Sequence, residues 1–315
     1  MKFFKPSFWT INKINFLAFM LLPLSVFVQI FIFLKNKLIK KYFFEAPIIC
    51  VGNIYIGGTG KTPLTIEIAQ ILKNLNKNPA IIKKNYHNQV DEIELIKNKM
   101  NNLIVSSNRK KAIENAINIK NYDTIVLDDG LQDETINKDL NIVCFTTDQI
   151  IGNGLTIPAG PLREPLSSIV KYQMIVINKN DKTSTKVFEK KIKKISTKTS
   201  IYYSKYLPDM SVIKRLKHKK IIAFAGIGNC NSFFNLLTDY NLNVVKKIYF
   251  PDHYNYKLEE LQKILYEAEK NNQEIITTEK DFYRLKNHNI NINYLPIFLQ
   301  IENKDKLIDE IKTFI

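Results

Sequence analysis

The strongest hydrophobic pattern in the chain lies near its N-terminus, where residues 16–34 carry no charged side chain. As a helix, this run would extend roughly 28 Å, close to the ~30 Å hydrocarbon core of a bilayer. Lysines flank both ends, so the positive-inside rule gives no orientation. The pattern predicts that residues 1–41 form a membrane-anchoring helix with basic flanks, which spans the bilayer or lies in one leaflet. A core helix docked on the rest of the chain is the alternative.

Beyond this segment, short apolar runs alternate with helical patterns. The candidate strands of a first series are residues 46–51, 79–83, 124–127, 141–145 and 174–177. This alternation is typical of a doubly wound α/β domain with a parallel sheet, and we assign residues 42–200 to it. A second series has candidate strands at residues 221–225, 244–248, 275–277 and 295–299, and a closing helix at 304–315. We expect residues 201–315 to form a smaller α/β domain that contributes to an inter-domain active site.

Composition narrows the choice of partners without deciding it. The chain has 315 residues, with 46 Lys and Arg against 30 Asp and Glu, and a formal charge of +16. This excess suits nucleic acid, phospholipid surfaces or phosphorylated substrates, although part of it can be background composition on solvated faces. The three cysteines are far apart and include no C-x-x-C pair, so neither a disulfide framework nor a zinc site is indicated.

A glycine-rich segment stands between the first candidate strand and an amphipathic helix. It consists of Gly57, Gly58, Thr59, Gly60, Lys61 and Thr62, followed by Pro63. In a phosphate-binding loop the glycines let backbone N–H groups approach phosphate oxygens, the lysine reaches the terminal phosphates, and the threonine hydroxyl can bind Mg²⁺. Tyr55 stands where the full pattern has a glycine. The segment predicts a bound nucleoside triphosphate and a P-loop NTPase-type doubly wound sheet.

A second motif supports this prediction. The apolar strand at 124–127 ends in Asp128, Asp129 and Gly130, which is the form of a Walker B element that holds Mg²⁺ directly or through water. A simple turn is the alternative, because Asp and Gly favour turns. Beside the phosphate-binding loop, the metal interpretation is favoured, with Thr62, Asp128 and Asp129 as the predicted ligands.

Phosphoryl transfer to an alcohol also requires a group that accepts a proton. Asp91 opens a helical pattern after the second strand, where a helix N-cap is the alternative role. His253 lies in a short aromatic loop after a strand, and a lone loop histidine is more often structural. Arg163 and Glu164 lie in a proline-rich loop suited to phosphate or substrate positioning, with a surface salt bridge as the alternative.

Taken in order, these residues resemble a known family, the tetraacyldisaccharide 4′-kinases, which phosphorylate a lipid A precursor. The resemblance extends along nearly the whole chain and rests on residues 51–53, 57–63, 128–132, 158–165, 224–229, 250–253 and 277–281. It implies an ATP- and Mg²⁺-dependent transfer to the 4′-hydroxyl of an acylated glucosamine disaccharide 1-phosphate. The reaction would take place at the cytoplasmic face of the inner membrane, on an anionic lipid surface. The resemblance also implies that Asp91 is the catalytic acid and that His253 pairs with it. From the phosphate-binding loop motif, we predict that Lys61 is a third catalytic residue, which holds the β- and γ-phosphates.

The chain departs from the family pattern mainly after the second strand. Where the family usually carries Arg-Gly-Tyr-Gly, residues 84–87 read Lys-Asn-Tyr-His, so only Tyr86 carries over. Val90 replaces a glycine, and Leu131 and Asp133 replace the usual Phe and His. Loss of an arginine removes a bidentate phosphate donor. We therefore expect an altered acceptor preference rather than a dead enzyme, with Tyr86, Arg163 and Glu164 positioning the substrate.

The alternative from another class is a membrane-attached P-loop ATPase that acts as a switch or partitioning factor. Such proteins carry a second lysine just before the Gly-Gly of the loop, and this chain has Ile56 there. Nucleic-acid binding ranks third, because the sequence holds no recognisable reader motif.

Overall fold

The computed structural model describes residues 6–10, 15–86, 89–179, 184–285, 288, 290 and 292–315. His87, at the end of the altered loop, and Lys2, Lys5 and Lys13, in the predicted basic flank, lie outside the described residues. Within the described part, the chain forms two compact units. The larger unit comprises residues 6–85, 102–205 and 300–315, and the smaller unit comprises residues 86–101 and 206–299. The domain boundaries expected from the sequence stay a prediction.

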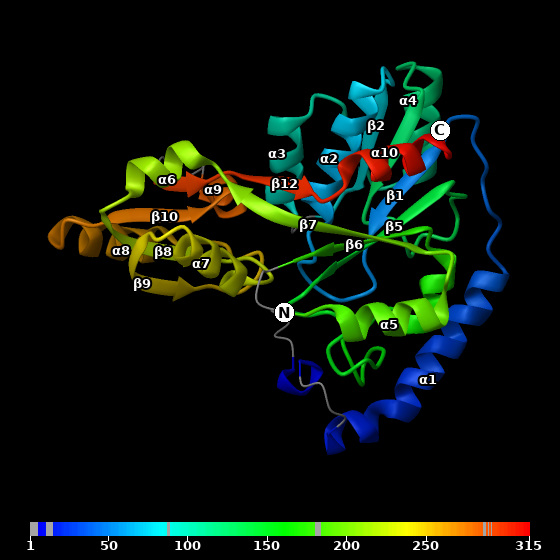
Figure 1. Cartoon of the computed structure of the whole chain (residues 1–315), viewed down its shortest axis with the longest axis horizontal. Helices are drawn as coiled ribbons and strands as arrows, with labels where there is room; N and C mark the ends of the chain where they lie inside the picture. The colour runs from blue at the N-terminus through cyan, green and yellow to red at the C-terminus, as the bar shows by residue number, and fades with distance from the viewer. Residues whose placement is uncertain are drawn as a thin grey trace. The chain divides into compact units, whose positions relative to one another are not determined.

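Most residues of an eight-stranded sheet belong to the larger unit (Figure 1). The strand order of this sheet is β12-β7-β6-β5-β1-β4-β2-β3. Its strands are β1 (Ile48–Gly52), β2 (Pro79–Lys84), β3 (Leu103–Ser106), β4 (Thr124–Asp128), β5 (Leu140–Thr146), β6 (Met174–Asn178), β7 (Ser200–Pro208) and β12 (Ile297–Ile301). β1 is buried along its whole length and pairs in parallel with β4 and β5. The strands that follow β1 in the chain therefore lie on both sides of it in the sheet. Such a topological switch point is where ligands bind in open α/β sheets.

The helices of the larger unit are η1 (Ser7–Trp9), α1 (Phe16–Lys37), α2 (Lys61–Asn74), α4 (Arg109–Asn118), η2 (Leu166–Lys171), α5 (Lys186–Ile195) and α10 (Lys304–Lys312). Of these, α2, α4 and α5 contribute buried side chains to its core, whereas α1 is mostly exposed. Alternate residues of β1 and β4, such as Ile48 and Leu127, share one hydrophobic cluster with α4 and α5. The residues between them, such as Ile49, are buried on the opposite face because strand side chains alternate. Both faces are therefore covered, as in parallel sheets generally.

The smaller unit has a four-stranded parallel sheet with the order β11-β10-β8-β9. Its elements are α3 (Val90–Lys99), α6 (Met210–Leu216), β8 (Lys220–Ala225), α7 (Cys230–Asp239), β9 (Asn243–Tyr249), α8 (Leu258–Lys270), β10 (Glu274–Thr278), α9 (Glu279–Leu285) and β11 (Asn293–Leu295). Ala223 lies in one hydrophobic cluster and its neighbour Phe224 in another. The central strands β8 and β10 are therefore buried on both faces, whereas the edge strand β9 is mostly exposed.

One predicted element is wrong. The single strand expected at residues 295–299 is two strands, because Pro296 separates β11 from β12 and has no N–H to continue a ladder. β11 pairs with β10 in the four-stranded sheet, whereas β12 joins the eight-stranded sheet. The strands β3 and β7 and the helix α4 were not predicted.

Helix α1 has an unusual exposure pattern. Large apolar side chains are exposed along its length, and only Ala18 and Ser25 are buried. It is the one helix in the described part of the chain that is long and apolar enough to cross a membrane, by length and composition alone. Such exposure is inconsistent with the alternative of a core helix.

The Phe145 side chain should be a main support of the larger unit. It is fully buried on β5, and its ring meets that of Phe188 edge-on at 4.9 Å. Phe145→Ala should lower the free energy of unfolding by about 3–5 kcal/mol, because it removes an aromatic ring from a packed core. The chain has a single tryptophan, Trp9, which is buried in this unit, so its fluorescence in a urea titration reports the loss.

The matched control is Phe43→Ala, since Phe43 is 74% exposed. This change should alter the free energy of unfolding by less than about 0.5 kcal/mol. Equal destabilisation by the two substitutions would contradict the assignment of Phe145 to the core.

Candidate functional site

The predicted phosphate-binding loop occupies the expected place in the larger unit. It follows the end of β1 and enters α2 at Lys61, directly after Gly60. Gly57 and Gly60 have φ angles of 120° and 85°, a region that L side chains rarely adopt, so these two positions require glycine. The buried Asn53 side chain donates to the carbonyl oxygens of Tyr55 and Gly57 at 2.6 and 3.1 Å and fixes the start of the loop.

The loop is suited to an anion. Its last residues lead into the first turn of α2, where backbone N–H groups have no helical partner and the helix dipole favours negative charge. The Thr59 hydroxyl is buried and has no hydrogen-bond partner within the described residues, whereas Gly58 is exposed. A phosphate oxygen would give this hydroxyl the acceptor that it lacks.

The Asp128 carboxylate at the end of β4 faces the start of α2. It lies 3.4 Å from the Thr62 hydroxyl and accepts a hydrogen bond from the Thr65 hydroxyl at 3.1 Å. The Lys83 ammonium on β2 approaches the same carboxylate to 2.6 Å, and both side chains are almost fully buried. Burying two charges is costly unless they are paired, so this contact holds Asp128 in place. Lys83 was missed, although a lysine inside an apolar strand is a visible signal.

Asp129 has different partners from Asp128. Its φ of 56° lies in the left-handed region, and its carboxylate contacts the Lys61 ammonium at 3.8 Å and the Arg163 guanidinium at 3.1 Å. The predicted Arg163 and Glu164 are connected through the Gln132 amide, which accepts from Arg163 at 3.1 Å and donates to Glu164 at 2.9 Å. Loop and strand residues therefore form one polar network beside Lys61.

The donor set of this region fits Mg²⁺. The Thr62 hydroxyl and the Asp128 carboxylate offer hard oxygen ligands, which Mg²⁺ prefers. In the described ranges, no group of three or more His, Cys, Asp or Glu side chains could hold a metal ion by itself. A Mg²⁺ ion here would therefore take its remaining ligands from phosphate oxygens and water, as such ions usually do.

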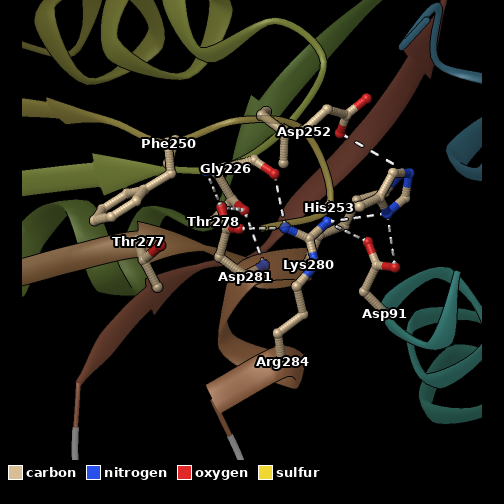
Figure 2. Close-up of polar contacts among 12 residues, drawn as sticks. Asp91, Gly226, Phe250, Asp252, His253, Thr277, Thr278, Lys280, Asp281 and Arg284 are labelled. Carbon is tan, nitrogen blue, oxygen red and sulfur yellow. Dashed lines mark hydrogen bonds and ion pairs between the residues drawn. The ribbon is translucent and has the colours of Figure 1, made fainter. Parts of the chain in front are cut away.

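The smaller unit contains a second polar cluster, which brings Asp91 and His253 together (Figure 2). The Asp91 carboxylate lies 3.2 Å from the Nδ1 atom of His253, and its other oxygen accepts from the Arg284 guanidinium at 2.5 Å. Asp91 is only 2% exposed. It is the second residue of α3 and not its N-cap, which is Gln89. The alternative role predicted for Asp91 is therefore wrong.

Arg284 is held in turn by residues from separate sequence motifs. It donates to the Asp281 carboxylate at 2.8 Å and to the Gly226 carbonyl oxygen at 2.7 Å. Asp281 also accepts hydrogen bonds from the Gly226 N–H and from the hydroxyls of Tyr256 and Thr278. The motifs around residues 226, 253 and 281 thus meet at one arginine. No sequence pattern indicated Arg284, because only the packing of α9 against α3 brings it to Asp91.

The charges of this cluster reinforce one another. Burial alone would raise the pKa of the Asp91 carboxyl, but the hydrogen bond with His253 and the charge of Arg284 outweigh it and lower the pKa to about 2. Burial would lower the pKa of His253, yet the hydrogen bond with Asp91 and the charge of Asp252 raise it above its usual value. The cluster therefore favours an ionised Asp91 beside a protonated His253.

Tyr86 and Lys280 lie at the edges of this region. Tyr86 is exposed, and its carbonyl oxygen accepts from the Gln89 N–H in the turn that leads into α3. Lys280 pairs with Glu92 at 2.7 Å. The first turn of α3 therefore carries two carboxylates, Asp91 and Glu92, each paired with a basic side chain, and Tyr86 lies in the turn that leads into it.

A phosphate-binding loop after the central strand of a parallel sheet, faced by a carboxylate at the end of the neighbouring strand, defines a P-loop nucleoside triphosphate-binding fold. A family model described as LpxK, tetraacyldisaccharide-1-P 4′-kinase, matches residues 17–315. The chain belongs to the tetraacyldisaccharide-1-P 4′-kinase family and is a kinase. The resemblance stated from the sequence blocks is confirmed, and nothing favours the alternative of an ATPase switch.

Individual relatives agree with this assignment. The chain is 40% identical over 316 residues to the tetraacyldisaccharide 4′-kinase of Pelagibacter ubique, covering 99% of this chain and 98% of that one. It is 33% identical to the protein of the same name from Rickettsia felis, covering 98% and 97%. The crystal structure of LpxK from Aquifex aeolicus in complex with ATP superposes with a TM-score of 0.72 at 24% identity, over 95% of this chain and 99% of that chain. The shared fold confirms the predicted fold class.

The contact between Asp91 and His253 predicts a measurable coupling. Asp91→Asn should lower the pKa of His253, because it removes the negative charge that raises this pKa, leaves at most a weaker hydrogen bond to a neutral amide, and keeps the opposing charge of Arg284. An NMR titration of the histidine ring measures the change. Glu94→Gln removes a carboxylate that pairs with Lys97 on the same helix and should leave the titration of His253 as it is. An unchanged or higher His253 pKa in Asp91→Asn would refute the coupling.

Proposed function

We propose that the chain transfers the γ-phosphate of ATP to the 4′-hydroxyl of a tetraacylated glucosamine disaccharide 1-phosphate, a step of lipid A biosynthesis. The observation that carries this proposal is the phosphate-binding loop with Asp128 facing Thr62, in a member of this kinase family. The names of the relatives support a tetraacyldisaccharide as the phosphate acceptor, and the ATP-bound LpxK structure supports ATP as the phosphate donor.

On the donor side, the loop amides and Lys61 would hold the β- and γ-phosphates. Thr62, Asp128 and Asp129 are the proposed residues that hold Mg²⁺, which when bound neutralises charge on the phosphate oxygens. Arg163 contacts Asp129 at 3.1 Å and thereby helps to set the charge beside Lys61. Positioning and charge stabilisation supply most of the rate enhancement in phosphoryl transfer, so this arrangement suits the reaction.

On the acceptor side, we assign Asp91 to receive the proton of the sugar hydroxyl, with His253 positioning it. Arg284 and His253 hold the carboxylate ionised, so it can accept a hydrogen bond from the hydroxyl at physiological pH. Tyr86, Arg163 and Glu164 are proposed to position the acceptor. General base catalysis of this kind contributes roughly 10²- to 10⁴-fold to a rate.

We place the protein at the cytoplasmic face of the inner membrane, with α1 lying in one leaflet. The Ser25 and Gln29 side chains of α1 bond to backbone oxygens of residues 156 and 163, so one side of the helix is occupied by protein. Lipid cannot surround the helix over those turns. The opposite sides expose apolar residues, as in helices that lie in the membrane interface. The anionic surface of the leaflet would attract the lysines that follow α1.

The function is tested with the purified full-length chain, ATP, Mg²⁺ and tetraacyldisaccharide 1-phosphate. The lipid product should gain one phosphate, detected by mass spectrometry. Asp91→Asn should lower kcat about 10²- to 10⁴-fold, because the hydroxyl loses its proton acceptor. The KM for ATP should stay unchanged, since Asp91 does not belong to the phosphate-binding loop.

Glu94→Gln, on the same helix as Asp91, is the matched control and should retain wild-type turnover. Hydrolysis of ATP without a phosphorylated lipid would favour the ATPase alternative and refute the proposed function. Wild-type turnover by Asp91→Asn would remove Asp91 from the mechanism.

The membrane placement predicts that exposed residues of α1 hold the protein on lipid. Phe27→Lys with Phe31→Lys replaces two side chains that are 67% and 62% exposed. Each change removes an aromatic side chain whose burial in the leaflet contributes about 1.5–3 kcal/mol, so most of the protein should move to the soluble fraction after ultracentrifugation. Ile119→Lys, at an exposed position after α4, is the control and should remain with the membranes. Retention of the double variant would contradict this placement.

A further inference from the structure

Helix α1 makes a specific contact that an anchor does not need. Ser25 is 2% exposed on a helix whose side chains are otherwise mostly exposed. Its hydroxyl donates to the Thr156 carbonyl oxygen at 2.9 Å and accepts from the Ala159 N–H at 2.9 Å. The hydroxyl thus ties together two backbone groups of residues 153–163, which we call the bridging loop. A buried hydroxyl without partners is costly, so these two bonds fix how the loop meets the helix.

Neighbouring N-terminal residues hold the same loop. The Trp9 indole N–H donates to the Pro158 carbonyl oxygen at 3.1 Å. The carbonyl oxygen of Trp9 accepts from the Asn153 N–H at 3.0 Å. The Gln29 side chain, one helical turn after Ser25, lies 3.4 Å from the Arg163 carbonyl oxygen. Contacts from η1 and α1 are therefore distributed along the whole bridging loop.

The other side of the bridging loop contacts the phosphate-binding region. The Ile56 N–H, directly before Gly57, donates to the Pro161 carbonyl oxygen at 2.9 Å. The Arg163 N–H donates to the Ile54 carbonyl oxygen at 2.7 Å. The Arg163 side chain then pairs with Asp129, which also contacts Lys61. Hydrogen bonds on both sides of the bridging loop, its own backbone and the ion pairs of Asp129 thus connect α1 to the phosphate-binding loop.

We propose that Ser25 is a positioning residue for the nucleotide site, so that α1 forms part of the donor site as well as the membrane anchor. By holding Thr156 and Ala159, Ser25 fixes the bridging loop in the conformation that presents Pro161 to Ile56 and Arg163 to Asp129. This inference rests on the proposed function only in that the phosphate-binding loop takes ATP. Because coupling between sites is reciprocal, bound ATP also strengthens the contact of α1 with the loop.

The test compares Ser25→Ala with Leu24→Ala in the full-length protein in detergent micelles. Leu24 is the adjacent α1 residue and is 50% exposed, so Leu24→Ala controls for the general effect of shortening a side chain at this point of α1. Ser25→Ala should weaken binding of a fluorescent ATP analogue about tenfold, because two backbone groups lose their partner. The KM for ATP should rise by the same factor while the KM for the lipid acceptor stays unchanged. Hydrogen exchange at the Ala159 amide should become faster in Ser25→Ala alone.

Trp9→Phe provides an independent variant, because it keeps an aromatic ring but removes the N–H donor to Pro158. It should weaken ATP binding in the same direction with a smaller factor, and it decides the matter if Ser25→Ala fails to fold. Both variants should stay in the membrane fraction, since neither removes exposed apolar surface from α1. Wild-type ATP affinity in a folded Ser25→Ala protein, or in Trp9→Phe if Ser25→Ala does not fold, would overturn the proposal.

The outcomes separate this proposal from the proposed function. If the wild-type chain binds ATP without phosphorylating the lipid, the proposed function is refuted. The coupling between Ser25 and the nucleotide site is then still tested by the ATP affinity of the two variants. A wild-type chain that phosphorylates the lipid, with unchanged ATP affinity in both variants, refutes the coupling alone. Absence of ATP binding by the wild-type chain overturns both.

Discussion

The pairing of β1 with β4 is the constraint on which the donor site depends. In this parallel register Val51 lies opposite Asp128, so the loop after β1 and the carboxylate at the end of β4 reach the same edge of the sheet. α2 then starts at that edge, which brings Thr62 and Thr65 to Asp128. A shift of one residue would turn Asp128 to the other face of the sheet, because strand side chains alternate. Burial of β1 on both faces makes such a shift costly.

Each unit contains a buried carboxylate that is stabilised by a basic side chain. Lysine is the partner in the larger unit, and arginine with histidine is the partner in the smaller unit. Lys83 holds Asp128 within the core, where an unpaired charge would be strongly destabilising. Arg284 and His253 hold Asp91, and its pKa of about 2 makes it a weak base for a sugar hydroxyl. In phosphoryl transfer the proton can leave late, so a carboxylate that orients the hydroxyl contributes even when its basicity is low. These contacts fit the role proposed for Asp91, in which the carboxylate orients the sugar hydroxyl and then receives its proton.

The sequence predicted what local patterns determine and missed what depends on packing. The phosphate-binding loop and the strand ending in Asp128 were found because residue order alone defines them. Arg284 was missed because its partner Asp91 is distant in the sequence, and α9 and α3 must pack before the two meet. The division of residues 295–299 depends on Pro296 and on which sheet accepts each strand, and a short apolar run does not reveal this. The role of Ser25 was also hidden, because a single serine in a hydrophobic helix has no distinctive pattern.

The structure shows the surroundings of the first residues of the altered loop after β2, Lys84 and Asn85. Lys83 and Lys84 are adjacent on a strand, so their side chains point to opposite faces, and only Lys83 pairs with Asp128. Lys84 occupies the position where the family usually has arginine, and a lysine there offers a point charge in place of a bidentate fork. The backbone at this point is still held, because the Asn85 N–H donates to the Ser106 carbonyl oxygen at 3.0 Å. Gly57 and Gly60 adopt left-handed φ angles and Thr62 faces Asp128, so we propose that the departures from the family pattern affect recognition of the acceptor rather than the donor side.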